Sequence, residues 1–502
     1  MAYLMALDEG TTSCRTIIFD DKSRIVSVAQ QEFGQHFPKP GWVEHDAAEI
    51  WSKQLETMHQ VMKDADLSAE DIASIGITNQ RETVVLWDRR TGVPVHNAIV
   101  WQDRRTAKMI SRYDTPEHRK IVHERTGLLL DPYFCATKIN WLLEHVSGLR
   151  ADAEAGHIAF GTIDSWLLWN LTDGEVHCTD ISNACRTLLY DLHRQCWDEE
   201  LLELFEIPAS ILPEVKPTSC HFGSTASSIL GSPVHIGGMI GDQQSALFGQ
   251  ACVEPGMAKT TYGTGCFLLL NTGDKAITSE NNMLTTVAWQ LEGGAPTYAL
   301  EGSVFMGGAS IQWLRDGLKI IDDAPGVNEL AASVPSSEGV LLVPAFAGMG
   351  APYWDPFARG AILGLTRGST SAHIARATLE GIACQVCDLL HAMERDSGVA
   401  LKELRVDGGA AASDLLMQIQ SNLLDRHVLR PEVLETTALG AAFMAGLACG
   451  VYESLTDVSE HWNQDRRFES EMDAAKRAEH LDLWSRAVKR SRNWIKEDEH
   501  EA

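Results

Sequence analysis

The two halves of this sequence each begin with the same short pattern: a β-forming run, a polar turn that contains glycine, and a second β-forming run. The runs and turns are Leu4–Leu7, Asp8-Glu-Gly-Thr-Thr-Ser13 and Thr16–Phe19, then Met257–Tyr262, Gly263-Thr-Gly265 and Cys266–Leu270. Short apolar runs bounded by glycine and hydroxyl residues are typical of β-hairpins. We therefore expect two halves of similar architecture, although the identity between them is too weak to establish a duplication.

Length and helical periodicity extend this expectation to an α/β fold. The chain has 502 residues, too many for one ordinary core, so we expect one domain over residues 1–249 and another over 250–502, with insertions. A stripe of apolar residues at helical spacing stops near Gly398, as a helix C-terminus should. The stripe consists of Ala375, Leu379, Ile382, Val386, Leu389 and Met393. Residues 470–496 predict a charged helix.

Two further strand signals surround polar segments. Ala73–Thr78 and Thr83–Trp87 flank Asn79-Gln-Arg-Glu82 and predict another hairpin. Leu404-Arg-Val-Asp-Gly-Gly-Ala410 predicts a strand that runs into a glycine-rich turn, and residues 414–424 continue as an amphipathic helix.

Charge and cysteine usage narrow the class of protein. The formal net charge is −27, which disfavours nucleic acid and anionic membranes as partners, since both reward basic patches. Residues 1–8 lack the features of a signal peptide, and no run is long and apolar enough to cross a membrane. Cys384 and Cys387 form a lone CxxC pair within a helical pattern, which favours core packing. We expect a cytoplasmic protein without integral membrane association.

The polar turns offer a way to bind phosphate without the usual motifs. No segment reads Gly-x4-Gly-Lys-Ser/Thr, and no protein-kinase motif set is present. Glycine lets backbone N–H groups face an anion, hydroxyls can donate to phosphate oxygens, and Asp8 at a strand end can hold Mg²⁺. The candidate donors are Thr11, Thr12, Ser13, Arg15 and Thr264. Each turn alone is more often only a turn, so the hypothesis requires both turns to face one triphosphate.

Several motifs resemble a known family. The two turns and Val406-Asp-Gly-Gly409 are similar to the two phosphate turns and the adenosine turn of actin-like ATPases. Gly360–Leu365 with His373–Glu380 resembles the C-terminal signature of the FGGY family of carbohydrate kinases, and Tyr133…Lys138–His145 its N-terminal one. The resemblance implies two actin-like (ribonuclease H-like) domains of mixed sheets flanked by helices, with a cleft between them that closes around ATP.

Within that family the longest matches are to members that act on glycerol. They are Lys39–Asp46, Ile77–Thr83, Asn97–Gln102, Gly241–Gln244, Tyr262–Phe267 and Ala309–Arg315. They imply ATP-dependent phosphorylation of glycerol to sn-glycerol 3-phosphate, with ATP/ADP and Mg²⁺ as cofactors and a homo-oligomer, dimer or tetramer, as the assembly.

The same resemblance implies a role for individual residues. Arg81 would donate to the acceptor's hydroxyls through its fork, Glu82 and Asp242 would accept from them, and Asp242 would be the catalytic base. The implied acceptor set is Arg81, Glu82, Trp101, Tyr133, Asp242, Gln243 and Phe267, with Trp101 and Phe267 covering the carbon edge. The implied nucleotide set is Thr11, Thr12, Ser13, Arg15, Thr264, Gly308, Gln312, Gly409 and Ser413, with Asp8 at the metal.

Besides Cys135, which stands in the N-terminal signature where serine, threonine or proline is usual, three places depart from the family's pattern. Glu9 stands where glutamine is usual, so an extra charge enters the first turn unless its side chain points away. Ser413 stands where an asparagine commonly contacts adenine, although a serine can still cap the following helix. Residues 226–235 contain no arginine and few glycines, whereas bacterial relatives often carry a Gly- and Arg-rich loop there that binds a sugar bisphosphate. We therefore expect no inhibition by fructose 1,6-bisphosphate through this loop.

Three alternatives stay open. A kinase for another polyol or a ketose such as xylulose would be distinguished by a substrate panel. An actin-like or chaperone-like ATPase would hydrolyse ATP without a small acceptor, and it leaves the polar and aromatic acceptor set unexplained. A catalytically inactive scaffold is opposed by the presence of Asp8, Asp242 and Thr264. Arg81 and Glu82 could also be only a surface ion pair, and Trp101 and Phe267 only core aromatics.

Overall fold

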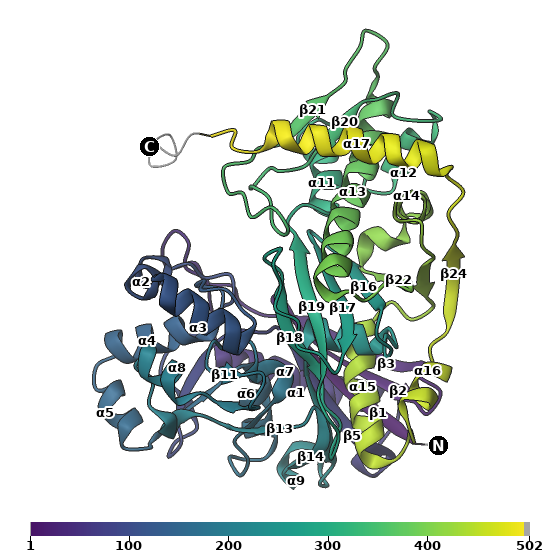
Figure 1. Cartoon of the computed structure of the whole chain (residues 1–502). Coiled ribbons are helices and arrows are strands. Elements are labelled where there is room, and N and C mark those ends of the chain that lie inside the picture. The colour runs from purple at the N-terminus through teal and green to yellow at the C-terminus, as the bar shows by residue number, and fades with distance from the viewer. Residues whose placement is uncertain (1, 496–502) are drawn as a thin grey trace.

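The computed structural model describes residues 2–495 and contains two large mixed β-sheets flanked by helices (Figure 1). The first sheet has the order β14-β15-β5-β1-β2-β3. Its strands are β1 (Tyr3–Glu9), β2 (Ser13–Asp20), β3 (Ile25–Glu32), β5 (Ile72–Asn79), β14 (Ser219–Ser224) and β15 (His235–Gly241). The second has the order β18-β19-β17-β16-β22-β23-β24. Its strands are β16 (Met257–Tyr262), β17 (Cys266–Gly273), β18 (Leu284–Trp289), β19 (Thr297–Val304), β22 (Glu403–Asp407), β23 (Val428–Pro431) and β24 (Gln464–Phe468).

The two sheets share one topology. In the first, the β1–β2 hairpin is antiparallel, β5 and β15 add in parallel on the β1 side, and the antiparallel strands β14 and β3 complete the two edges. In the second, the β16–β17 hairpin has β22 and β23 in parallel, then antiparallel β24, and antiparallel β19 on the other side. Strand β18 extends only the second sheet. The prediction of two similar α/β halves, each begun by a hairpin, is confirmed.

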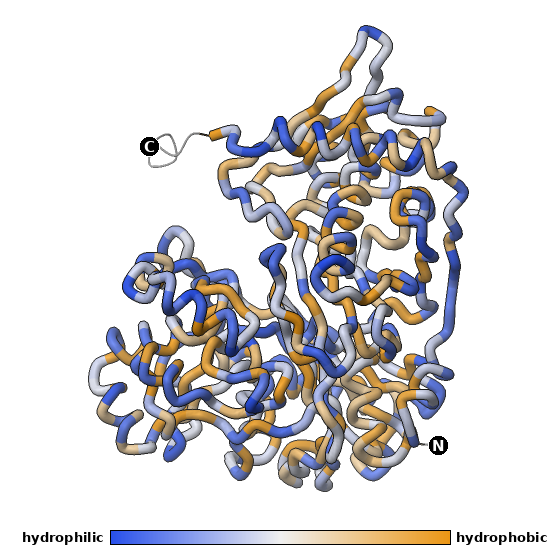
Figure 2. The backbone as a smooth tube through the Cα atoms, viewed as in Figure 1, coloured by the Kyte–Doolittle hydropathy of each residue, from blue (hydrophilic) through white to orange (hydrophobic). Residues whose placement is uncertain are grey.

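Two helices pack between the sheets and share a core with both. They are α10 (Asp242–Gly249) and α15 (Thr436–Cys449). A Cβ atom at Gly440 would lie 2.0 Å from the carbonyl oxygen of Ser245, and one at Gly76 would lie 2.0 Å from that of Ala441. Glycine at these positions therefore lets the helices approach each other and the first sheet closely. Figure 2 shows mostly hydrophobic residues along α15, which is in contact with β5 and β15.

Residues between β5 and β14 form a helical lobe with its own core, drawn in blue and teal in Figure 1. It contains β6 (Val85–Asp88), β7 (Val93–Pro94), β9 (Ile158–Gly161), α2 (Ala107–Tyr113), α3 (Pro116–Thr126), α4 (Cys135–His145), α5 (Leu149–Glu154), α6 (Ile163–Leu171), α7 (Ile181–Ala184) and α8 (Glu199–Leu204). The predicted hairpin of 73–78 with 83–87 is wrong, because β6 pairs with β7 and β9 in a separate sheet. The intervening residues turn away into the site, where Glu82 has a φ of 59°.

The remaining helices pack against the two sheets or against one another. They are α1 (Ala47–Asp64), α9 (Ser227–Leu230), α11 (Gly308–Asp316), α12 (Gly326–Ala332), α13 (Ser371–Ser397), α14 (Asp414–Leu424), α16 (Leu455–Glu460) and α17 (Ala474–Ser491). Helices α12 and α17 are in contact with α13, and α16 lies in the core shared with α15. The predicted helix end at Gly398 is confirmed, since this residue caps α13 with a φ of 65°. Cys384 and Cys387 lie on α13 and are buried in the core of the second half, as expected. Within residues 2–495, no helix is both long and apolar enough to span a membrane.

Candidate active site

A polar pocket of about 180 Å³ lies where the first turn, the β5 end and the start of α10 meet. Its lining residues are Thr11, Arg81, Glu82, Trp101, Tyr133, Asp242, Gln243 and Phe267. All seven residues predicted to bind the acceptor are therefore brought together, along with Thr11 of the first turn. A cavity of about 150 Å³ holds benzene, so this pocket has room for a polyol of similar size.

The pocket's aromatic wall is held by contacts to the first turn. The Trp101 indole donates to Thr11 Oγ1 at 3.0 Å, and its ring meets that of Tyr133 edge-to-face at 5.7 Å between centroids. Phe267 lies on β17, directly after the second turn. Trp101, Tyr133 and Phe267 all remain partly accessible, so they form the rim of a cavity and not the interior of a core.

The charged floor of the pocket is buried, which excludes the reading of Arg81 and Glu82 as a surface pair. Arg81 is 3% exposed and Glu82 is 1% exposed. The Glu82 carboxylate accepts from Arg186 Nε at 2.6 Å. Lys138, also buried, donates to the backbone carbonyls of Glu82 at 3.0 Å and Tyr133 at 2.6 Å. Burial lowers the pKa of Lys138 to about 8.

The Arg81 fork differs from its sequence-based prediction, because Glu301 on β19 occupies it. Arg81 Nη1 and Nη2 donate to the Glu301 carboxylate at 2.6 and 3.0 Å, and Nη1 also donates to Gln244 Oε1 at 3.0 Å. One N–H of Nη2 has no partner among residues 2–495 and stays available to a ligand. Sequence reasoning missed Glu301, Arg186 and Lys138; Glu301 and Arg186 carry no motif that points to the pocket.

Asp242 is the first residue of α10 and lies directly after β15. Its side chain is 32% exposed and faces the pocket. Oδ1 accepts from the Gln243 backbone N–H at 2.7 Å and lies 3.1 Å from Arg81 Nε. Within the described part of the chain Oδ2 has no partner, so one carboxylate oxygen is oriented by the protein and the other is free.

The neighbouring Gln243 is held from the second sheet. Its side-chain oxygen accepts from Lys259 Nζ at 2.6 Å, and Lys259 also donates to Thr261 Oγ1 at 2.9 Å. Lys259 is fully buried on β16, and burial lowers its pKa. The pocket is thus built by both halves of the chain.

Asp8 is a half-buried residue near the end of β1 and pairs in register with Arg15 across the hairpin. Burial raises the pKa of Asp8 to about 6; Arg15 opposes this, and the carboxylates of Glu435 and Asp242 add to it. Arg15 itself is hydrogen-bonded to Glu435 through Nη1, so the predicted polyphosphate cation has a partner in this structure. The Asp8 carboxylate is therefore left with little compensation for its charge.

Glu9 points away from the turn and is fully buried. Gln80 Nε2 donates to both carboxylate oxygens of Glu9 at 3.2 Å and to the Gly10 carbonyl at 3.0 Å. Burial raises the pKa of Glu9 well above its ordinary value, more than Gln80 lowers it. Glu9 therefore adds no exposed charge to the first turn.

The second turn is held by backbone alone. The Gly263 N–H donates to the Gly265 carbonyl at 2.9 Å, and the N–H groups of Gly307 and Gly308 donate to the carbonyls of Thr264 and Gly263, each at 2.8 Å. Thr264 is exposed and lines a larger cavity of about 720 Å³, which shares Trp101, Tyr133, Gln243 and Phe267 with the polar pocket. The two turns therefore open toward one connected space.

Of the residues predicted to bind the adenosine end, Gly308 contacts the second turn directly, because its N–H donates to the Gly263 carbonyl. A Cβ atom at Gly408, where φ is 84°, would lie 2.7 Å from the Tyr262 carbonyl, so only glycine fits between β22 and the turn. Gly409 is exposed, as is Gln312 on α11. The Ser413 hydroxyl caps α14 by accepting from the Leu416 N–H at 3.1 Å, and it also bonds to Asn328 Oδ1. The predicted helix cap is confirmed.

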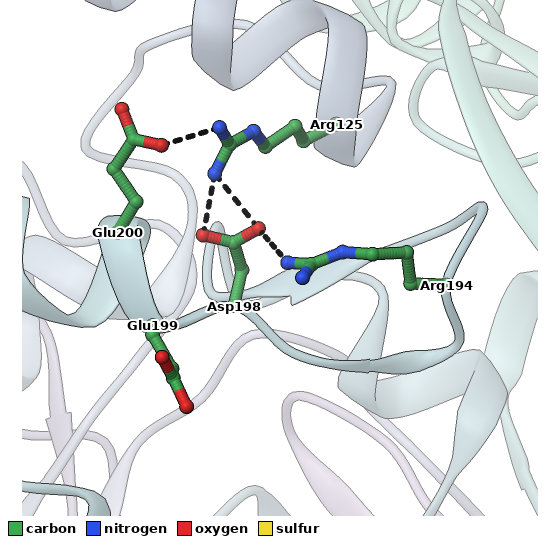
Figure 3. A pocket seen from close by; sticks show the side chains of 5 residues that line it. All are labelled: Arg125, Arg194, Asp198, Glu199 and Glu200. Atoms are coloured by element: carbon green, nitrogen blue, oxygen red, sulfur yellow. Dashed lines mark hydrogen bonds and ion pairs between the residues drawn. The ribbon is translucent and has the colours of Figure 1, made fainter.

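A different polar hollow, on the helical lobe, does not have the character of a ligand site (Figure 3). Arg125 Nη1 donates to both oxygens of Asp198, at 2.8 and 2.9 Å, and its other terminal nitrogen bonds to Glu200. Arg194 bonds to the same Asp198 carboxylate, while Glu199 points away from these pairs. Both arginine side chains are already paired with carboxylates, so neither is free to hold an anionic ligand.

Comparisons with known proteins agree with this geometry. Residues 3–249 match the N-terminal domain of the FGGY family of carbohydrate kinases, and residues 258–449 match its C-terminal domain. The chain is 57% identical to a glycerol kinase of Deinococcus radiodurans over 500 residues, covering 100% of this chain and 99% of that one. It is 53% identical to glycerol kinase 2 of Thermotoga maritima, covering 99% and 100%.

Solved structures give the same result. The crystal structure of Plasmodium falciparum glycerol kinase with ADP matches with a TM-score of 0.93 at 37% identity over 98% of both chains. A xylulose kinase of Lactobacillus acidophilus, with a TM-score of 0.89 at 21% identity over 100% of both chains, shares the fold. With two family domains matched in order, a full-length resemblance and a charged pocket between two actin-like halves, this chain belongs to the FGGY family of carbohydrate kinases.

Proposed function

We propose that this protein transfers the γ-phosphoryl group of ATP to glycerol and releases sn-glycerol 3-phosphate. The observation that carries the proposal is the polar pocket itself, with its buried Arg81 and Glu82 at the floor, Asp242 at one side and an aromatic rim. The names of the full-length relatives support the same acceptor.

The pocket's chemistry suits a small triol. Glu82 and Asp242 accept hydrogen bonds from hydroxyls, while the free N–H of Arg81 Nη2 and the Gln243 amide donate them. Trp101 and Phe267 offer apolar faces to the carbon chain. An acceptor without these hydroxyls would leave buried polar groups unpaired, so the pocket discriminates against it.

Asp242 is the proposed general base. Its Oδ1 is oriented by Arg81 and the Gln243 N–H, which leaves Oδ2 to accept the proton of the attacking hydroxyl. The bond from that hydroxyl oxygen to the γ-phosphorus forms as the bond to ADP's leaving oxygen breaks, so the reaction is mainly a matter of position and charge.

The two turns are the proposed nucleotide site. In the first turn Thr11 and Ser13 are partly exposed and Thr12 is exposed, as is Thr264 in the second turn, so their hydroxyls can donate to phosphate oxygens. Gly308, Gln312, Gly409 and Ser413 are the proposed contacts at the adenosine end. Arg15 joins the phosphates once its pair with Glu435 opens.

Asp8 fits a magnesium site. Its carboxylate has a pKa raised to about 6 by burial, and Arg15 compensates this only in part. Mg²⁺ binds proteins through one or two carboxylates, with water and substrate phosphates completing its shell. When bound beside Asp8, it would neutralise phosphate charge during transfer.

A coupled assay with ATP, Mg²⁺ and a panel of acceptors tests the proposal. We expect glycerol to give the highest kcat/KM, with erythritol and xylulose far weaker. Equal or better turnover of xylulose would assign the protein to another substrate of the family. ATP hydrolysis that is independent of any acceptor would favour an ATPase of another type.

A further inference from the structure

A buried carboxylate of the second half, Glu301, reaches across to the acceptor residues of the first half. Glu301 lies on β19, and its carboxylate is the partner of both terminal nitrogens of Arg81, at 2.6 and 3.0 Å. Arg186 Nη2 donates to the same carboxylate at 3.0 Å. The Glu301 side chain is 4% exposed and the two arginine side chains are 2% and 0% exposed. This cluster is therefore screened little by water.

The geometry fixes how Arg81 meets Asp242. A guanidinium group is planar and rigid, so a bidentate partner at its two terminal nitrogens also sets the direction of Nε. Nε lies 3.1 Å from Asp242 Oδ1. Arg81 thus meets one oxygen of Asp242 with a single nitrogen, and its stronger fork is held by Glu301.

The four ion-paired charges of the cluster balance, with Lys259 as a further buried cation that acts on Glu301. Arg81 and Arg186 face Glu301 and Glu82, with Arg186 Nε at 2.6 Å from Glu82. Burial acts to raise the pKa of Glu301, but the charges of Arg186 and then Arg81 outweigh it and lower the pKa to about 2. Glu301 is therefore ionised at any pH at which the protein works, and Asp242 lies outside the balanced set, at the pocket.

We propose that Glu301 is a positioning residue for the proposed phosphoryl transfer: it holds the Arg81 fork, so that Arg81 orients one oxygen of Asp242 and leaves the other free for the attacking hydroxyl. Without the Glu301 charge, Asp242 becomes a competing partner for the Arg81 fork. A bidentate Arg81–Asp242 pair would engage both oxygens of the base.

The test compares two substitutions that separate charge from shape. Glu301→Gln keeps the shape and removes the charge, whereas Glu301→Asp keeps the charge on a shorter side chain. Because misplacement of a catalytic group costs on the order of 10²-fold, we expect Glu301→Gln to lower kcat by about 10- to 100-fold. We expect Glu301→Asp to retain more of kcat than Glu301→Gln, and ADP affinity to change little in either variant.

A matched control is Asp388→Asn, which removes another buried carboxylate. Asp388 accepts from Tyr353 Oη at 2.8 Å and from Trp484 Nε1 at 2.6 Å within the core of the second half, away from the pocket. We expect this variant to lose stability while its kcat and glycerol KM stay near those of the unmodified protein.

Two outcomes would overturn the inference. One is a Glu301→Gln enzyme with unchanged kcat. The other is a kcat that is higher in Glu301→Gln than in Glu301→Asp, which would assign Glu301 a packing role. The inference rests on the proposed function, but the two can fail separately. If the unmodified protein does not phosphorylate glycerol, the proposed function is refuted. If the unmodified protein and Glu301→Gln phosphorylate glycerol with the same kcat, only the role of Glu301 is refuted.

Discussion

The two hairpin turns have the same topology but opposite chemistry. The first turn is surrounded by ionisable groups: Asp8 and Arg15 flank it, Glu9 lies buried behind it, and Glu435 reaches it from the other half. The second turn, Gly263–Gly265, is held by backbone hydrogen bonds and contributes a neutral hydroxyl, that of Thr264.

This difference shows how two halves with the same topology can contribute different chemical groups to one site. In the proposed function, Asp242 would accept a proton and Asp8 would hold Mg²⁺, and both carboxylates depend on pH and on their partners. In the proposed function, the second turn would hold phosphate through backbone N–H groups and a hydroxyl, which do not titrate. Changes to the ionisable groups around the first turn should therefore depend on pH, whereas changes to the neutral second turn and the helix caps of its half should be smaller and independent of pH.

The largest effect should follow from Asp242→Asn. The amide cannot accept the hydroxyl proton as a base does, so we expect turnover to fall by about 10²- to 10⁴-fold while the protein still folds and binds ADP. Steady-state kinetics with glycerol, together with ADP titration by calorimetry, measure both. Near-normal turnover would show that Asp242 is not the general base, and the base would then have to be sought outside the first half.

Glu9→Gln should make the stability of the protein less dependent on pH, an effect that the neutral second turn cannot give. The unfolded chain releases the Glu9 proton near the ordinary pKa of about 4.3, whereas the folded protein keeps it to higher pH because burial raises the pKa. Between these two pKa values the wild-type protein loses about 1.4 kcal/mol of stability per pH unit, and the glutamine variant does not. Unfolding by urea at several pH values should therefore show an advantage of Glu9→Gln that grows as pH rises from about 4.3.

Glu70→Gln, the same substitution at an exposed glutamate, serves as the control. A constant advantage of Glu9→Gln over the same range would mean that Glu9 is ionised in the fold. It would also make the two turns more alike than the structure indicates.

Local sequence patterns were enough to predict the architecture. They failed where residues distant in sequence determine the course of the backbone. Both hairpins, the glycine-rich turn after β22 and the end of α13 follow from residues close in sequence. The segment after β5 was predicted as a hairpin because turn residues lie between two apolar runs. Its true course is set by Arg186, Lys138 and Glu301, which are distant in sequence and hold Arg81 and Glu82 in the pocket.

The same limit applies to side-chain direction. The sequence alone could not tell whether Glu9 faces the turn or the interior, because β-strand alternation gives either face to a residue at a strand end. The Arg81 fork was likewise assigned to the acceptor, since Glu301 belongs to a strand of the other half. Acceptor residues could be predicted through the family resemblance, but the charges that hold them could not.

A smaller effect should follow from Ser413→Ala in the second half. Loss of this helix N-cap should lower the free energy of unfolding by about 1 kcal/mol at every pH, because a serine hydroxyl does not titrate. The hydroxyl is already bonded to Leu416 N–H and to Asn328, so we expect the KM for ATP to change by no more than about twofold. Ser454→Ala, which removes the cap of α16, is the matched control. A several-fold rise in the KM for ATP with unchanged stability would instead make Ser413 an adenine contact.

The smallest expected effect concerns residues 226–235, a part of the first half that lacks charge. Its one ionisable group is His235, whose ring stacks on His221 at 4.9 Å and whose pKa is lowered by burial and by His221. A bisphosphate needs several fixed cations, preferably arginines with bidentate geometry, and this segment offers none. Millimolar fructose 1,6-bisphosphate should therefore leave the initial rate with glycerol unchanged, with inorganic phosphate at the same concentration as the control. Strong inhibition by the bisphosphate alone would mean that cations elsewhere in the first half form an anion site. Functional charges would then lie outside the first turn and the pocket as well.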